Sequence, residues 1–144
     1  MPIAPVELSY EPPAHGWIKL RLTIFDREIE IDASDVPNNP VQQLVVAVRA
    51  LSEGRDASVW WHLEPEWYVM RFRHTLGGIR LDIERCQSPD DEASKQSIVA
   101  YSGVDVMEPF LGFLRDFRLR DFSEYDWPKV DWRPLGQLHV PFSI

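Results

Sequence analysis

The 144 residues suffice for one domain with a hydrophobic core and are too few for two comfortable ones, so we expect a single domain over residues 1–144. Hydrophobic residues make up 44% of the chain and charged residues 26%, a balance typical of a soluble globular protein rather than a disordered one. The formal charge of −8 would repel phosphate backbones and anionic membranes, which argues against nucleic acids and membranes as partners.

The sequence carries no signal for export or membrane insertion. No apolar run approaches the roughly 18 residues that a membrane span needs, and the N-terminal segment lacks basic residues ahead of an apolar core. Cys86 is the single cysteine, so an intramolecular disulfide is impossible and a cysteine-based metal site is not expected. We therefore expect a cytoplasmic protein.

Residues 1–16 form a Pro-rich arm, which we expect to be extended, to lack a regular element and to cover an edge of the fold. From Trp17 to Ile24 apolar and polar residues alternate, and the alternation resumes from Glu28 to Ile31, which predicts a β-hairpin. The outer faces of its strands carry opposite charges, so cross-strand pairs should help to fix the register. The charged residues are Lys19 and Arg21 on the first strand and Glu28, Glu30 and Asp32 on the second.

An amphipathic helix should follow the hairpin. Asn39 is a natural N-cap, and Pro40 suits the first helical position. Gly54 lies where a left-handed residue commonly ends a helix. One apolar stripe at helical spacing should pack on the sheet, and it comprises Val41, Leu44, Val45, Val48 and Leu51.

Three antiparallel strands are predicted between Ala57 and Cys86, with breaks at Pro65-Glu66 and Gly77-Gly78. One face of these strands is apolar and should meet the core. It comprises Val59, Trp61, Leu63, Tyr68, Met70, Phe72, Ile79, Leu81 and Ile83. The opposite face should meet water and comprises Trp60, His62, Glu64, Trp67, Val69, Arg71, Arg73, Arg80, Asp82 and Glu84.

An acidic loop over residues 87–95 contains Asp90, Asp91 and Glu92, and is either a contact site or simply solvated. A short strand is expected over residues 97–102. A second helix should begin at a capping box formed by Asp105 and Glu108, with an aromatic core face. The Pro-rich and Trp-rich tail over residues 121–144 should wrap back over the domain, with a short strand near residues 138–140.

These elements predict an α+β fold, a two-layer sandwich of an antiparallel sheet of about five or six strands with two helices on one face. The expected order is two strands, a helix, four strands and a second helix. Residues 17–120 form the core in this interpretation.

His62, Glu64 and Glu66 form the densest polar group of the sequence, because residues two apart on a strand share a face. A metal site needs a third ligand, and neither an HExxH helix nor a cysteine pair supplies one. We predict no catalytic residue, no metal and no cofactor. Two alternatives stay open: an enzyme that uses His62 and Glu64, and a small-ligand-binding domain whose pocket is lined by Trp60, Trp67 and Tyr68.

The order of elements resembles small bacterial immunity proteins that neutralise polymorphic toxins, including those similar to the wall-associated protein A immunity family. The likeness covers roughly residues 16–120 and includes the stretch from Leu44 to Gly54, Leu63-Glu64-Pro65 and the last helix VMEPFLGFLRDF. The resemblance implies a non-catalytic protein that binds its toxin stoichiometrically.

The acidic charge fits a basic toxin domain as the partner, and exposed aromatic side chains can serve as anchors. The contacts expected from charge and exposure are Trp60, Glu64, Glu66, Asp90, Asp91 and Glu92. The oligomeric state stays open.

Overall fold

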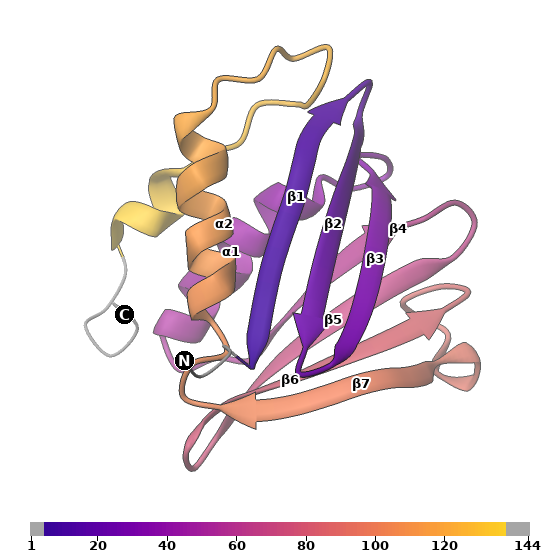
Figure 1. Cartoon of the computed structure of the whole chain (residues 1–144), viewed down its shortest axis with the longest axis vertical. Coiled ribbons are helices and arrows are strands. Elements are labelled where there is room, and N and C mark those ends of the chain that lie inside the picture. The colour runs from indigo at the N-terminus through magenta and orange to yellow at the C-terminus, as the bar shows by residue number, and fades with distance from the viewer. Residues whose placement is uncertain (1–4, 138–144) are drawn as a thin grey trace.

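The computed structural model describes residues 5–137, in which one antiparallel sheet and two α-helices form the fold (Figure 1). The strands pair in chain order from β1 to β7. Their bounds are β1 Val6–Ala14, β2 Trp17–Ile24, β3 Arg27–Ser34, β4 Ala57–His62, β5 Trp67–Thr75, β6 Gly78–Cys86 and β7 Gln96–Gly103. Helix α1 (Pro40–Ser52) lies between β3 and β4, and α2 (Glu108–Leu119) follows β7. Short 3-10 turns are η1 (Glu92–Ser94) and η2 (Arg133–Gln137). The predicted α+β class is confirmed, with seven strands instead of five or six.

The additional strand is β1, so the prediction that the N-terminal arm lacks a regular element is wrong. Alternating residues of β1 turn towards the core, with Val6 buried and Leu8 and Tyr10 packed against it. Pro12 and Pro13 are tolerated because β1 is an edge strand and its register shifts between Glu11 and Ala14. The segment Val6–Ala14 therefore forms a strand, although its prolines predict an irregular chain.

The β2–β3 hairpin has the predicted charge pairs. Lys19 stands opposite Asp32 and forms a 3.5 Å ion pair with Glu30, and Arg21 pairs with Glu28 at 2.7 Å. Both contacts are diagonal across the strands. They lie on the face of the sheet away from the helices.

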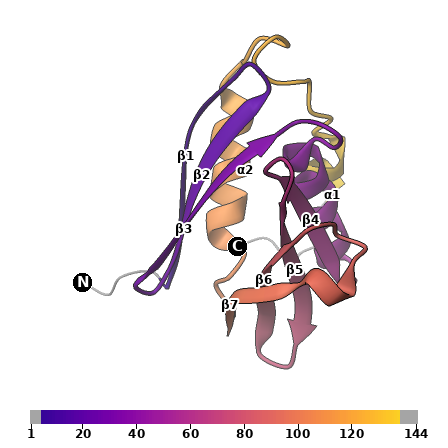
Figure 2. The same ribbon diagram turned by 90° about the vertical axis from the view of Figure 1, so that its right-hand side faces the viewer.

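The sheet bends at the seam between β3 and β4, where Ser34 and His62 are the only paired residues. The two halves, β1–β3 and β4–β7, stand at an angle, with both helices on its inner side (Figure 2). Where β3 no longer pairs with β4, side chains form the hydrogen bonds to the β4 backbone. Gln43 Oε1 accepts the Trp60 N–H at 2.7 Å, and Asn38 Nδ2 donates to the Trp60 carbonyl at 2.9 Å. The bend thus leaves no break in the backbone hydrogen bonding at Trp60.

Helix α1 begins as predicted. Asn39 Oδ1 accepts from the backbone N–H groups of Val41 (3.1 Å) and Gln42 (3.2 Å), and Pro40 is the first helical residue. Gly54 has a φ of +81°, which glycine adopts without strain. The predicted apolar stripe is fully buried.

Helix α2 begins differently from the prediction. It starts at Glu108 after Met107, which makes no side-chain capping hydrogen bond. Asp105 Oδ1 instead accepts a hydrogen bond from the Tyr101 hydroxyl at 3.3 Å. The predicted capping box does not form, because the turn over residues 104–107 keeps Asp105 beside Tyr101 of β7.

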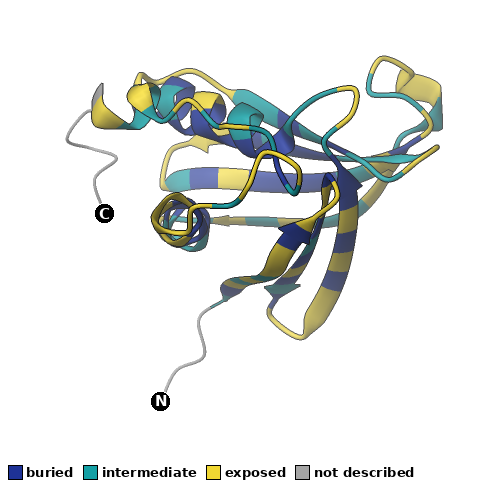
Figure 3. Ribbon diagram, turned by 90° about the horizontal axis from the view of Figure 1, so that it is seen from above, coloured by how far each residue is buried: buried dark blue, intermediate teal, exposed yellow. Residues whose placement is uncertain are grey.

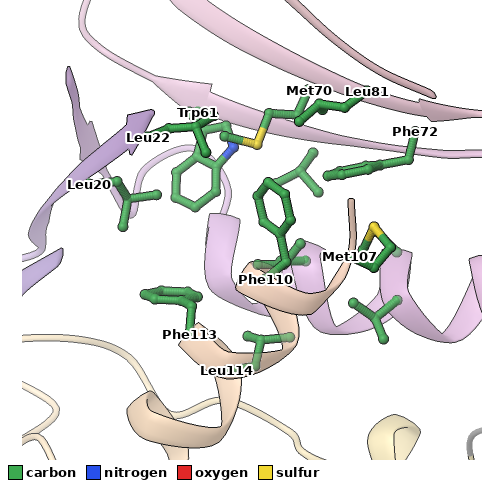
Figure 4. Packing of buried hydrophobic residues seen from close by; sticks show 14 of the residues in the cluster. Leu20, Leu22, Trp61, Met70, Phe72, Leu81, Met107, Phe110, Phe113 and Leu114 are labelled. Carbon is green, nitrogen blue, oxygen red and sulfur yellow. The ribbon is translucent and has the colours of Figure 1, made fainter. Parts of the chain in front are cut away.

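The core fills the inner side of the bent sheet. Trp61 and Phe72 from the sheet point towards Phe110 and Phe113 of α2, and the rings of Phe72 and Phe110 meet edge to face at 5.2 Å (Figure 4). Along β2, buried residues alternate with less buried ones, and Figure 3 shows such bands of colour on the strands. On β5 and β6 the predicted inward residues Met70, Phe72, Leu81 and Ile83 are buried, but the prediction that Val69 meets water is wrong, because it is 1% exposed between Trp60 and Glu84.

The described part of the C-terminal tail packs against the rest of the fold. Trp127 is 2% exposed, and its indole Nε1 donates to Asn39 Oδ1 at 3.2 Å. The carbonyl of Asp126 accepts from the Gly16 N–H at 2.9 Å. The strand expected near residues 138–140 lies outside the described residues. Among the described helices, none is long and apolar enough to cross a membrane.

Candidate binding surface

The sheet half β4–β7 has one face without helices, which we call the outer face. Cross-strand pairs define it, since opposed residues share a face of the sheet. Val69 stands between Trp60 and Glu84, and Trp67 stands between His62 and Cys86. The other members of the outer face are Ser58, Arg71, Arg73, Arg80, Asp82, Ala100 and Ser102.

Three aromatic rings form a cluster on this face. The rings of Trp60 and Trp67 meet edge to face at 6.3 Å, and the His62 ring lies 4.2 Å from that of Trp67. All three side chains are half-buried. His62 Nδ1 lies 2.7 Å from the Val36 carbonyl oxygen, which can only accept, so Nδ1 carries the hydrogen. The cluster is thus held in place while part of each ring meets solvent.

A charged network covers the centre of the outer face. Asp82 is only 6% exposed and bonds to Arg73 at 2.7 Å and to Arg80 at 2.9 Å. The Arg80 guanidinium, with a contribution from Arg73, lowers the pKa of the Asp82 carboxyl. The prediction that Asp82 faces water is wrong, because the two arginines close over it. Arg71 pairs with Glu84 at 2.7 Å in the same way, and this bond raises the pKa of Arg71.

The acidic loop over residues 87–95 folds onto the same face. Glu92 reaches Arg71 at 3.6 Å and Lys95 at 2.5 Å. The Lys95 ammonium lowers the pKa of Glu92, and the Lys95 side chain is itself 6% exposed. Burial raises the pKa of the Cys86 thiol beneath this end of the face, so the thiol stays protonated at neutral pH.

Of the six predicted contact residues, Trp60 belongs to the outer face and Glu92 reaches it through Arg71, whereas the other four lie in the turn between β4 and β5 and in the acidic loop. Glu64 is exposed in the turn between β4 and β5, and Asp90 and Asp91 are exposed in the acidic loop. Within residues 5–137 these three carboxylates have no ion pair or side-chain hydrogen bond. Glu66, in contrast, is ion-paired with Arg85.

The structure brings Glu66 and the acidic loop to one shallow hollow of about 390 Å³. Its lining residues are Glu66, Arg85, Cys86, Gln87, Ser94 and Gln96. The juxtaposition follows from the β5–β6 register, which sets Tyr68 opposite Arg85. Such a contact between distant segments has no signal in local sequence patterns.

His62 and Glu64 do not share a strand face, so this prediction is wrong. Strand β4 ends at His62, and the Leu63 N–H donates to the Glu66 carbonyl across the turn at 2.7 Å. Glu64 has a φ of +55°, outside the strand region. The described residues contain no group of three or more side chains that could hold a metal ion.

The aromatic pocket predicted from Trp60, Trp67 and Tyr68 does not form. Trp60 and Trp67 point to the outer face, whereas Tyr68 stands opposite Trp61 on the inner face, so the three do not line one pocket. An aromatic hollow of about 220 Å³ lies instead at the end of α2. Its walls include Phe117, Phe122, Trp127, Trp132, Arg118, Arg120 and Lys129. The aromatic residues of the tail over residues 121–144 are the sequence signal for this hollow.

No protein-family model matches the chain, and neither a curated protein nor a solved structure matches it.

Proposed function

We propose that the chain is a non-catalytic protein-binding domain, an immunity protein that neutralises a cognate polymorphic toxin in the cytoplasm. The observation that carries the proposal is the outer face, where the half-buried Trp60 and Trp67 rings form a pair, with exposed carboxylates in the turn after β4 and in the acidic loop. The partner it fits is a basic toxin domain.

The aromatic rings supply the anchors of this interface. Tryptophan side chains are prominent among residues that dominate binding energy, because they bury a large area with few rotatable bonds. Trp60 is fixed by its neighbours, since Gln43 and Asn38 hold its backbone and Trp67 contacts its ring. A partner that covers the pair would therefore bury apolar area at a low cost in side-chain entropy.

The carboxylates supply charge complementarity. Glu64, Asp90 and Asp91 are exposed and free of intramolecular ion pairs in the described chain, so a lysine or arginine of the partner can approach them without displacing an arginine. Glu66 and Glu92 are already paired with Arg85 and Lys95. The first three carboxylates are the stronger candidates for contacts with a cation.

The whole chain would steer a basic partner. With a formal charge of −8, it attracts cationic proteins over distances of about a Debye length. The helix-free face of β1–β3 adds to this field, since its carboxylates outnumber its cations. These carboxylates are Glu7, Glu11, Glu28, Glu30 and Asp32, against Lys19 and Arg21.

Coexpression with the C-terminal domain of a large protein encoded by a neighbouring gene tests the proposal. We expect the chain to restore growth of cells that produce the toxin domain and to copurify with it in equal amounts. Trp60→Ala together with Trp67→Ala should abolish both effects without loss of the fold. If the intact chain neither rescues growth nor binds the domain, the immunity function is wrong.

A second candidate is a small-ligand-binding domain, and the hollow at the end of α2 favours it. Its aromatic walls and the cations Arg118, Arg120 and Lys129 suit a small planar anion. A shift of the Trp132 indole N–H resonance in NMR spectra on addition of indole-3-acetate, and not of uncharged indole, would support this function. Equal responses to the two compounds would exclude the hollow as an anion site.

A further inference from the structure

Strand β7 is an edge of the sheet, and its sequence lacks the usual protection of an edge. Gln96–Gly103 contains no charged residue and no proline. Edge strands of monomeric proteins are commonly blunted by charge, proline or a covering element, because their free backbone groups pair readily with another strand. The register of β7 with β6 shifts between Ile83 and Glu84, but the regular part of the strand opposite residues 79–83 has none of these protections and points to a strand-pairing site.

The other edge, β1, shows the contrast within the same sheet. It contains Pro12 and Pro13 next to a shift in register. Helix α2 runs beside it (Figure 1), and the Tyr10 hydroxyl donates to Asp116 of that helix at 2.5 Å. No described helix or strand lies along β7 in this way, although the ring of Phe25 touches Tyr101 on the inner face at 5.3 Å.

The pleat determines which backbone groups of β7 point outward. The His74 N–H of β5 donates to Asp56 on the β4 side, so its neighbour Arg73 directs its N–H towards β6. Alternation across the β6 register then turns Val99 and Tyr101 towards β6. Ala100 and Ser102 consequently present their N–H and C=O groups outward, where no described residue bonds to them.

The charges at the two ends of β7 select the partner. Asp90, Asp91 and the Glu92–Lys95 ion pair precede the strand, and Asp105 follows it, so both ends carry negative charge. A second copy of this chain paired antiparallel along β7 would bring the acidic loop of one copy beside Asp105 of the other, which is unfavourable. A segment with basic residues at its ends meets these carboxylates favourably.

We propose that β7 accepts an extended segment of a basic protein partner, which pairs through its backbone with Ala100 and Ser102 as an additional strand of the sheet. The inference rests on the proposed function, because it assigns a docking mode to the same partner. Backbone pairing contributes affinity, and the side chains of alternate residues contribute specificity in such complexes. The acidic loop that borders the outer face leads directly into β7, so the two surfaces are continuous.

Amide hydrogen exchange measured by NMR tests the site with a defined probe, a short capped peptide of alternating lysine and valine. In the free chain the amides of Ala100 and Ser102 should exchange faster than those of Val99 and Tyr101. The peptide should slow exchange at Ala100 and Ser102, while the same peptide with glutamate in place of lysine should not. Protection elsewhere on the chain, or equal protection by both peptides, would overturn the inference.

Ala100→Pro removes one outward N–H and leaves the ladder to β6 intact, as proline is tolerated where its missing N–H faces away from the sheet. We expect the lysine peptide to bind it about tenfold more weakly, with the melting temperature nearly unchanged. Ala100→Lys keeps every backbone group and should weaken binding by repulsion, and Ala100→Glu is its matched control. If Ala100→Lys and Ala100→Glu bind the lysine peptide equally and as well as the intact chain does, the site is wrong.

The failure of this inference can be told apart from the failure of the proposed function. If the toxin domain binds the Ala100→Pro and Ala100→Lys variants as tightly as the intact chain, the immunity function is supported and the β7 site is wrong. If the chain binds no toxin, yet the lysine peptide protects the amides of Ala100 and Ser102 from exchange, the β7 site is supported and the immunity function is wrong. Protection of Ala100 and Ser102 that rises with protein concentration alone would assign the edge to a second copy and refute the basic partner.

Discussion

Asp82 is the buried anion of the outer face, and its charge is compatible with the fold because two guanidinium groups flank it. The carboxylate is 6% exposed, while Arg73 and Arg80 remain about half exposed. Solvent screens the arginines, so each pair contributes less than a fully buried ion pair would. The stability contribution of Asp82 should therefore be moderate and dependent on pH.

Asp82→Asn should lower the free energy of unfolding by about 1–2 kcal/mol near neutral pH. The pKa of Asp82 is lowered in the folded state, chiefly by Arg80, so its contribution is complete above the unfolded pKa. As the pH falls from about 4 through the lower folded pKa, protonation removes the contribution. Urea unfolding of both proteins between neutral and acidic pH should show the difference shrinking with acid. A difference that grows with acid would contradict this assignment.

Leu81 and Phe110 are fully buried where the sheet meets α2. Leu81→Ala and Phe110→Ala should each lower the free energy of unfolding by roughly 2–5 kcal/mol, because each leaves a cavity in the core. His62→Ala, on the outer face, should cost less than about 1 kcal/mol. Urea melts of the three variants check the order, and the reverse order would mean that the inner and outer faces are misassigned.

At the scale of elements, Asn39 joins the start of α1 to the C-terminal tail. Its Oδ1 accepts from two backbone N–H groups of the helix and from the buried Trp127 indole. Asn39→Ala should lower the free energy of unfolding by about 2–4 kcal/mol, since it removes a cap and leaves the indole N–H without a partner. Asn39→Asp keeps the acceptor and is the matched control. Equal losses in the two variants, measured by thermal unfolding, would show that the shared acceptor is not the cause.

The elements that could be predicted from the sequence are those with a local signal. The α1 cap at Asn39 and the strand faces around Leu81 depend on neighbours within a few residues, and both match the structure. Strand β1 has the same alternation, but Pro12 and Pro13 pointed to irregular chain, and only the neighbouring β2 shows that β1 is an edge. The burial of Asp82 depends likewise on arginines that the register places beside it.

The candidate site, too, could be predicted where its signal is local and not where it depends on distant segments. Alternation predicted Trp60 on the polar face of its strand, and this is where it lies. The end of β4 at His62 was missed, because a turn stabilised by contacts to Glu66 replaces the strand there. The nearness of Glu66 to the acidic loop depends on pairing between β5 and β6, which no single segment encodes.

At the scale of the whole molecule, the bend between β3 and β4 separates two helix-free faces with different character. The face of β1–β3 is dominated by carboxylates, whereas the outer face of β4–β7 adds aromatic rings to its charges. Long-range attraction of a basic partner is a property of the total charge, while close contact requires the exposed groups near Trp60. Association rates can separate these two contributions.

Long-range attraction and close contact can be separated with Glu64, Asp90 and Asp91, which have no intramolecular ion pair within residues 5–137. Replacing Glu64, Asp90 and Asp91 by lysine should slow association with the basic toxin domain by about tenfold at low salt and make the rate less sensitive to salt. The melting temperature should hardly change, because no ion pair within the described chain is lost. The matched control replaces by lysine three exposed carboxylates outside β4–β7 and its loops, namely Glu7 in β1, Asp26 between β2 and β3, and Glu124 after α2.

Both triple substitutions change the formal charge of −8 by the same amount, so a purely long-range effect would slow the two proteins equally. Local contacts predict in addition faster dissociation for the variant at Glu64, Asp90 and Asp91 alone, because short-range interactions set the lifetime of a complex. Stopped-flow association and surface-plasmon-resonance dissociation measure the two rates. Equal dissociation rates in the two variants would assign the role of these carboxylates to steering and would move the close contacts away from the rim of the outer face.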